Sequence, residues 1–206
     1  MIETHAHIYA EQFKEDIAEV IERAQEVGIE KIIMPNIDHS SIDDMMELEE
    51  RYPQLCLATM GLHPCSVNKD FEKELYQVED WLAKRSFVAI GEMGTDLYWD
   101  KTFKEQQIEA FKIQVSWAKQ YEKPIIIHCR ESLDLTIDLV EELKDERLTG
   151  VFHCFNGSAE QAKRIEDLGF FLGLGGVTTF KNAGMDKVVP EISRDRIVLE
   201  SDSPYL

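Results

Sequence analysis

Residues 2–7 read IETHAH, a short β-like stretch that ends in two histidines. The same arrangement, an apolar run followed by a side chain able to bind a metal ion, recurs in VAIGE (88–92), IIIH (125–128), VFH (151–153) and IVLESD (197–202). The side chains in question are His5, His7, Glu92, His128, His153 and Asp202. A site built from so many segments requires a fold that brings the strand ends to one rim. Parallel strands closed into a barrel do this at their carboxyl-terminal face.

The rest of the chain fits such a barrel. Strand-like runs are expected at residues 2–7, 31–36, 55–61, 88–91, 124–128, 150–153, 170–174 and 196–201. Amphipathic helical patterns separate them, as at residues 11–27 and 102–121, which implies parallel pairing through helical crossovers. The sequence therefore predicts an α/β fold, a TIM-type (β/α)8 barrel, in a single domain covering residues 1–206. The chain ends four residues after Asp202, so we expect a C-terminally shortened barrel without the helical segment that normally follows strand eight.

Bulk properties limit the partners. The formal net charge of −18 argues against broad adhesion to nucleic acid, and so favours strand ends or short single strands over a long duplex. No apolar run reaches the length of a membrane span, and no signal segment precedes the first strand. We expect a cytoplasmic protein, and nothing in the sequence indicates a membrane or an obligate protein partner. The four cysteines show no CxxC spacing and are expected to be free thiols.

The ligand types indicate one or two divalent ions. His5 and His7 are two residues apart and share a face if the strand is regular, which suits binding one ion from two sides. Glu92 has two carboxylate oxygens and could bridge two ions. Imidazoles favour zinc, manganese or iron, whereas carboxylates and a phosphate substrate suit magnesium or manganese. The sequence leaves the choice among Mg, Mn and Zn open.

Three further residues are candidates for substrate binding. His63, in GLHP (61–64), could bind a metal ion or donate a hydrogen bond to an anionic substrate. Arg130 could aim its planar donor fork at a phosphate or carboxylate. Lys181 is another possible anion contact, although a solvated surface charge explains it and Arg130 equally well. The glycine-rich segment 173–176 is expected to allow close backbone approach at the barrel mouth.

Together these motifs resemble the TatD family of metal-dependent hydrolases. The matching pieces are THAH (4–7), GLHP (61–64), AIGEMGTDLYW (89–99), KPIIIHCRES (123–132), VFHCFNGS (151–158), LGLGGVTTFKNA (172–183) and LESDSPYL (199–206). They occur in the family's order and cover nearly the whole chain. The resemblance implies an amidohydrolase-type TIM barrel, one or two divalent metal ions, and deoxyribonuclease activity.

The resemblance also implies roles for individual residues. It assigns the first metal to His5, His7, Glu92 and Asp202, the second to Glu92, His128 and His153, and the substrate phosphate to His63, Arg130 and Lys181. Gln107 matches a recurrent family position without an assigned chemistry. The chain departs from the family in Glu3, where an aspartate usually precedes the threonine, and in ESDSPYL, where ETDAPYL is commoner. Both departures keep the ligands.

The expected activity is hydrolysis of DNA phosphodiesters, most simply exonucleolytic, by a metal-activated water. Asp202 would orient or deprotonate that water, while Glu92 holds the metals together. One alternative is an amidohydrolase that cleaves a small amide, ester or lactone, because the same site polarises a carbonyl. A second is a binding protein that kept the barrel and lost catalysis.

Overall fold

The computed structural model describes residues 1–206 as eight parallel strands that alternate with helices. The strands are β1 (Ile2–Glu3), β2 (Lys31–Met34), β3 (Cys56–Ala58), β4 (Ile90–Asp96), β5 (Ile125–Arg130), β6 (Gly150–Phe152), β7 (Phe171–Leu174) and β8 (Ile197–Leu199). The order β1-β2-β3 forms one sheet and β4-β5-β6-β7-β8 the other, so each strand pairs with its neighbours in the sequence. The predicted α/β fold with parallel strands is confirmed.

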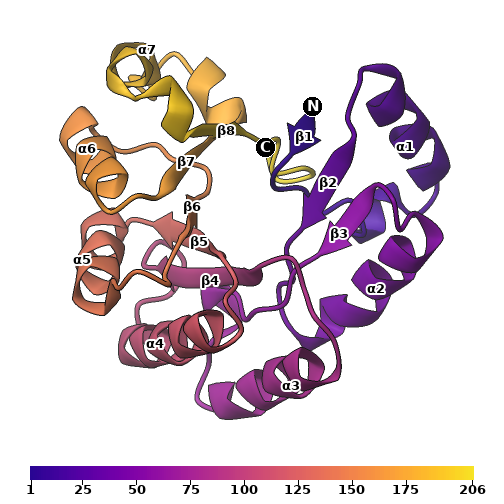
Figure 1. Ribbon diagram of the computed structural model, residues 1–206, viewed down its shortest axis with the longest axis horizontal. Coiled ribbons are helices and arrows are strands. Elements are labelled where there is room, and N and C mark those ends of the chain that lie inside the picture. Colours follow the sequence, from indigo (N-terminus) through magenta and orange to yellow (C-terminus); the bar gives the residue numbers. More distant parts are fainter.

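The helices lie outside the strands and cover their outer faces (Figure 1). They are α1 (Ile17–Glu26), α2 (Ile42–Arg51), α3 (Phe71–Lys84), α4 (Lys104–Gln120), α5 (Leu133–Leu143), α6 (Ala159–Asp167) and α7 (Met185–Val188), with short 3-10 turns between them. Their inward faces and the strands build one core, in which Phe111 of α4 and Phe152 of β6 are fully buried. None of the helices is both long and apolar enough to cross a lipid bilayer.

The two sheets meet at two seams. An isolated parallel bridge joins Met60, beyond β3, to Ile90 of β4. At the other seam the backbone N–H of Thr4 donates to the Leu199 carbonyl at 3.2 Å, and that of Asp202 donates to the His5 carbonyl at 2.9 Å. The two ends of the chain therefore lie side by side (Figure 1). This second seam carries three of the predicted metal ligands.

Several element boundaries differ from those expected. β1 ends at Glu3 and not at His7, because the N–H groups of Ala6 and His7 donate to Ile33 and Ser203 instead of continuing a regular ladder. The expected helix 11–27 splits into a 3-10 turn (Glu11–Phe13) and α1. β4 begins two residues later than predicted and runs on to Asp96, which places Glu92 inside the strand.

The outer surface near the second seam carries exposed apolar side chains. Ile2 of β1 is 51% exposed and Leu199 of β8 is 55% exposed. The residues after β8 form a turn.

Candidate metal centre

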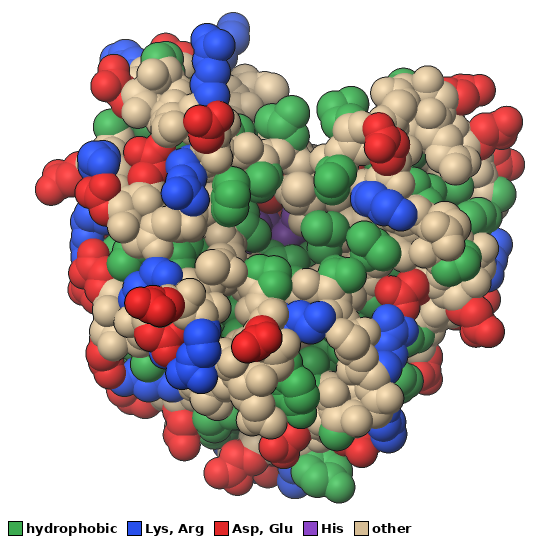
Figure 2. All heavy atoms as spheres, in the orientation of Figure 1, with side chains coloured by type: hydrophobic (Ala, Val, Ile, Leu, Met, Phe, Trp, Pro, Cys, Tyr) green, Lys and Arg blue, Asp and Glu red, His purple; other side chains and the backbone are tan.

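The predicted ligands gather at the carboxyl-terminal ends of the strands. All of them except the fully buried His5 line a hollow of about 470 Å³, within the roughly 300–1,000 Å³ typical of small-ligand sites. Figure 2 shows histidine side chains at the floor of this hollow, with hydrophobic side chains around it. Glu92, from β4, is 2% exposed and stands at the centre of the group. Its two oxygens face two different sets of imidazoles.

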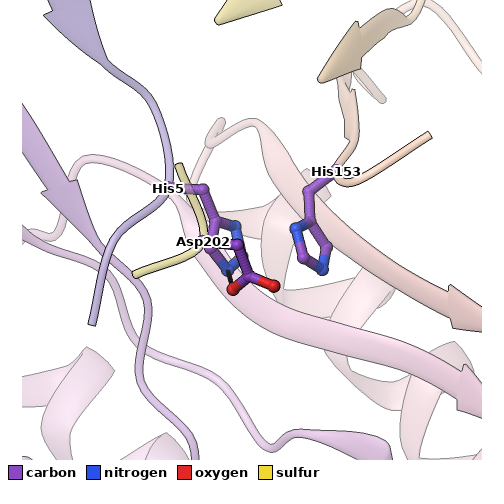
Figure 3. Close-up of side chains that lie close together, drawn as sticks. All are labelled: His5, His153 and Asp202. Carbon is purple, nitrogen blue, oxygen red and sulfur yellow. Dashed lines mark ion pairs between the residues drawn. The ribbon is translucent and has the colours of Figure 1, made fainter. Parts of the chain in front are cut away.

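One set surrounds Glu92 Oε2. The Nε2 atoms of His5 and His7 lie 3.3 and 3.5 Å from that oxygen and 3.2 Å from each other. Asp202 Oδ1 lies 3.6 and 3.7 Å from the same two nitrogens. Figure 3 shows Asp202 beside His5, with His153 alongside; the rings of His5 and His153 stack at 3.8 Å. We call His5, His7, Glu92 Oε2 and Asp202 the first group.

The other set surrounds Glu92 Oε1. His128 Nδ1 lies 3.0 Å and His153 Nε2 lies 2.9 Å from that oxygen, and the two nitrogens are 3.4 Å apart. His63 Nε2 lies 3.4 Å from it. We call His128, His153 and Glu92 Oε1 the second group. The carboxylate of Glu92 thus belongs to both groups, one oxygen to each.

These spacings fit bound cations. Four ligands arranged tetrahedrally at about 2.1 Å from an ion lie about 3.4 Å from one another. The contacts within the first group span 3.2–3.7 Å and those within the second 2.9–3.4 Å. Two unprotonated ring nitrogens 3.2 Å apart would repel without a cation or proton between them. The donor set of imidazole and carboxylate therefore suits zinc, manganese or magnesium.

Hydrogen bonds fix which ring nitrogen faces the centre. Tyr9 donates its hydroxyl proton to the Pro35 carbonyl, so it accepts from His7 Nδ1 at 2.8 Å. His7 Nε2 is therefore left without a proton and can bind an ion. His63 has the opposite tautomer, because its Nδ1 accepts the backbone N–H of Cys65 at 3.1 Å. His63 Nε2 thus carries a proton and faces the centre as a hydrogen-bond donor.

The buried charges set the protonation of the centre. Burial and the neighbouring His153 lower the pKa of His5 to about 4, which keeps that imidazole neutral. Burial would raise the pKa of Glu92, but the surrounding histidines lower it well below its ordinary value. Burial alone would lower the pKa of His153, yet Glu92 and Glu200 raise it well above the usual range. Burial raises the pKa of Asp202 to about 6.

Two carboxylates that lie behind the candidate ligands were not predicted from the sequence. Asp96 Oδ2 lies 2.9 Å from His128 Nε2, and Glu200 Oε1 lies 3.5 Å from His153 Nδ1. Each one stands behind a second-group histidine, on the side away from Glu92. Such a partner orients the ring and raises the basicity of the ligating nitrogen. Both follow the rule that found the ligands, since Asp96 ends β4 and Glu200 directly follows β8.

The glycine-rich segment serves this arrangement. A Cβ atom on Gly173 would lie 2.2 Å from Glu200 Oε2, so only glycine leaves room for that buried carboxylate. The expected close approach at the barrel mouth is therefore found, with a side chain as the neighbour. Cys129 and Cys154 follow His128 and His153 in the sequence but join neither group, and all four cysteines are free thiols.

Only two of the three predicted substrate-binding residues lie at the hollow. His63 and Arg130 line the hollow together with the metal-binding candidates. Lys181 is exposed beyond β7 and does not line it, so its contact with a substrate stays a prediction. Gln107 is buried and holds Asp96 in place: it accepts the Asp96 N–H at 2.8 Å and donates to its carbonyl at 3.1 Å.

Comparison with known proteins identifies the family of this chain. The model of the family described as TatD related DNase matches residues 2–206. The chain belongs to the TatD family. It is 41% identical, over its full length, to the uncharacterized metal-dependent hydrolase YabD of Bacillus subtilis, of which it covers 81%. It is 30% identical to the 3'-5' ssDNA/RNA exonuclease TatD of Edwardsiella piscicida, covering 100% of this chain and 80% of the relative.

The fold comparison agrees. The crystal structure of YjjV, a TatD homolog from Escherichia coli, superposes with a TM-score of 0.92 at 31% identity, over 99% of this chain and 79% of the other. This TatD-family chain therefore has the TIM-barrel fold of its relatives, as predicted. It is a metal-dependent hydrolase, and the groups around Glu92 are its candidate metal ligands.

Proposed function

We propose that this TatD-family hydrolase cleaves phosphodiester bonds at the ends of single-stranded DNA, by exonucleolytic attack of water at a centre of two divalent ions. The observation that carries the proposal is the position of Glu92, whose two oxygens face separate sets of imidazoles. Oε2 lies 3.3 and 3.5 Å from His5 and His7, and Oε1 lies 3.0 and 2.9 Å from His128 and His153. A carboxylate placed in this way would hold two cations close together. Such a pair of cations activates water and stabilises the charge on a transferring phosphoryl group.

The chain's own residues would divide the remaining work. Asp202 is 15% exposed at the edge of the first group, where its carboxylate would orient the attacking water and accept its proton. His63 presents a neutral Nε2–H toward the centre and would donate to a phosphate oxygen as negative charge develops there. Glu92 would hold its position in both groups throughout the reaction.

Arg130 supports phosphate as the substrate group. Its guanidinium makes no ion pair and stacks on aromatic rings, so its N–H groups stay free beside the centre. In a chain with a net charge of −18, an uncompensated arginine at the mouth of the hollow marks a place for an anion. The same net charge disfavours a long duplex, which supports strand ends as the substrate. The named activity of the relative from Edwardsiella piscicida is in line with this choice.

The test is an assay of the metal-loaded chain on end-labelled single- and double-stranded DNA, with amide and lactone controls. We expect stepwise release of nucleotides from single strands. Glu92→Gln and Asp202→Asn should each lower turnover by about 10²–10⁴-fold, the scale of a lost acid–base group. Glu72→Gln, an exposed change on α3, is the matched control.

Two results would contradict the proposal. Near-normal nuclease rates in both purified variants would show that Glu92 and Asp202 do not serve catalysis. Hydrolysis of the amide or lactone without cleavage of DNA would establish the small-molecule amidohydrolase instead, because the same donor set polarises a carbonyl.

A further inference from the structure

An exposed aromatic pair follows β4 at the mouth of the hollow. Trp99 is 70% exposed and Tyr98 51% exposed, whereas Trp117 of α4 is buried at 8%. The two exposed rings meet edge to face with centroids 4.8 Å apart. Large apolar rings held in water lose the free energy that their burial would supply. The exposure of Trp99 is therefore a feature that core packing does not explain.

The pair is held at a fixed place beside the metal centre. Asp96 Oδ1 accepts the backbone N–H of Tyr98 at 2.9 Å and that of Trp99 at 3.3 Å. The other oxygen of the same carboxylate binds His128 at 2.9 Å. One buried side chain thus joins the aromatic turn to a candidate metal ligand. The distance between the rings and the centre is set by this carboxylate.

Trp99 opens into the hollow that contains the centre. It lines that hollow with Glu92, His128 and Arg130. Tyr98 lies in the adjacent hollow, and Arg130 borders both. Hydrophobic side chains are gathered around the histidines in the space-filling view of this face (Figure 2). A group resting on the Trp99 ring would therefore be within the same space as the reacting atoms.

Arg130 adds a cation next to the rings. Its guanidinium carbon lies 3.9 Å from the Tyr98 ring centroid and 5.4 Å from that of Trp99. Because the guanidinium is held by stacking and forms no ion pair, its donors remain available to an anion. An aromatic face beside a free cation complements the two parts of a nucleotide: the ring can stack on the base, and the cation can bind the phosphate. This combination is typical of proteins that bind single-stranded nucleic acid.

We propose that Trp99 is a stacking platform for an unpaired nucleobase of the substrate, whose phosphate contacts Arg130 beside Glu92. The inference rests on the proposed function and adds the feature that selects single strands. In a duplex both faces of a base are covered by its neighbours, so only a base at a frayed end or in a single strand offers a face to Trp99. Every base has such a face, so the platform selects strand state rather than sequence.

Two oligonucleotides that differ only in their terminal bases test the proposal. One is a single-stranded octamer, and the other carries abasic tetrahydrofuran residues at both ends. The wild-type holoenzyme should prefer the first in kcat/KM. In Trp99→Ala this preference should fall by about 5- to 150-fold, the factor that corresponds to one lost base stack, and through KM. Trp99→Phe keeps an aromatic face and should keep most of the preference.

A binding measurement gives a second readout. A phosphorothioate octamer, which resists cleavage, should quench the fluorescence of the wild-type holoenzyme, and Trp99→Phe should remove most of the quench. Trp81 and Trp117 remain as unquenched references in both proteins. Equal losses on the two oligonucleotides in Trp99→Ala, or quenching that persists in Trp99→Phe, would overturn the platform alone. A wild-type chain that cleaves neither oligonucleotide would overturn the proposed function and the platform with it.

Discussion

Replacing Asp96 with asparagine would change one proton in the metal centre and leave the backbone in place. The carboxylate accepts from His128 Nε2 through Oδ2, and from two backbone N–H groups through Oδ1. Burial would raise the pKa of Asp96, but these hydrogen bonds lower it below its ordinary value, so it is ionised. In Asp96→Asn the amide oxygen can keep both backbone contacts. The amide NH₂ then faces His128 Nε2.

That contact favours the His128 tautomer with its proton on Nδ1, which cannot bind a metal ion through Nδ1. An NH₂ group cannot accept a proton from Nε2, so the favourable arrangement moves the ring proton to Nδ1. Nδ1 is the nitrogen that lies 3.0 Å from Glu92 Oε1, and a proton there blocks its lone pair. Loss of such an outer partner lowers metal affinity by about 10–100-fold. This corresponds to about 1.4–2.7 kcal/mol of binding free energy.

The assay is a calorimetric titration of the chelator-stripped protein with zinc. We expect two binding events in the wild type, and in Asp96→Asn a weakening of only the event that involves His128. Nitrogen-15 spectra of the metal-free Asp96→Asn variant should show the His128 ring proton on Nδ1. Asp100→Asn, an exposed change four residues away, controls for the lost charge. Wild-type affinity for both equivalents in Asp96→Asn would refute the reasoning.

Three other predictions follow from features away from that contact. Gln114 accepts the N–H of buried Leu62 at 2.7 Å and donates to its carbonyl at 3.3 Å, so Gln114→Leu should lower the free energy of unfolding by about 2–4 kcal/mol in urea. The exposed Gln120→Leu is its control, and equal stabilities would contradict the account. Chelation should lower the melting temperature, and metal added back at about 1,000 times its Kd should raise the free energy of unfolding by about 4 kcal/mol. A melting curve that metal does not change would count against the metal centre. Burial raises the pKa of the Cys56 and Cys129 thiols to about 12. Both thiols should therefore react slowly with Ellman's reagent at pH 7 and faster as the pH rises. Rapid reaction of all four thiols in the folded chain would contradict this account.

The sequence predicted the candidate ligands because their signal is local. A short apolar run followed by a histidine or carboxylate marks the end of a parallel strand, and strand ends meet at one rim in a barrel. His128 and His153 were placed in this way, and both lie within 3.0 Å of Glu92 Oε1. The strand alternation that governs the direction of side chains also explains why Cys129 of β5 stays out of the groups. Cys154 lies in a turn beyond β6, with a φ of 48°.

The features that were missed depend on contacts between distant segments. β4 was expected to stop at Gly91, and the residues that follow include Glu92, Gly94 and Asp96, which have low strand propensity. Pairing with β5 extends it to Asp96, and that pairing puts the carboxylate beside His128. The active ring nitrogen of each histidine could not be read from the sequence either. It depends on the partner of the other nitrogen, which for His128 comes from a different strand.

The two groups draw on the sheets unequally. The second group lies wholly in the larger sheet, with Glu92 from β4, His128 from β5 and His153 beyond β6. The first group also needs His5 and His7, which follow β1 of the smaller sheet. An ion held there would add a link between the first and last strands, beside the backbone hydrogen bonds from Thr4 to Leu199 and from Asp202 to His5. Removal of that ion should therefore loosen the contact between β1 and β8 more than the contacts within the larger sheet.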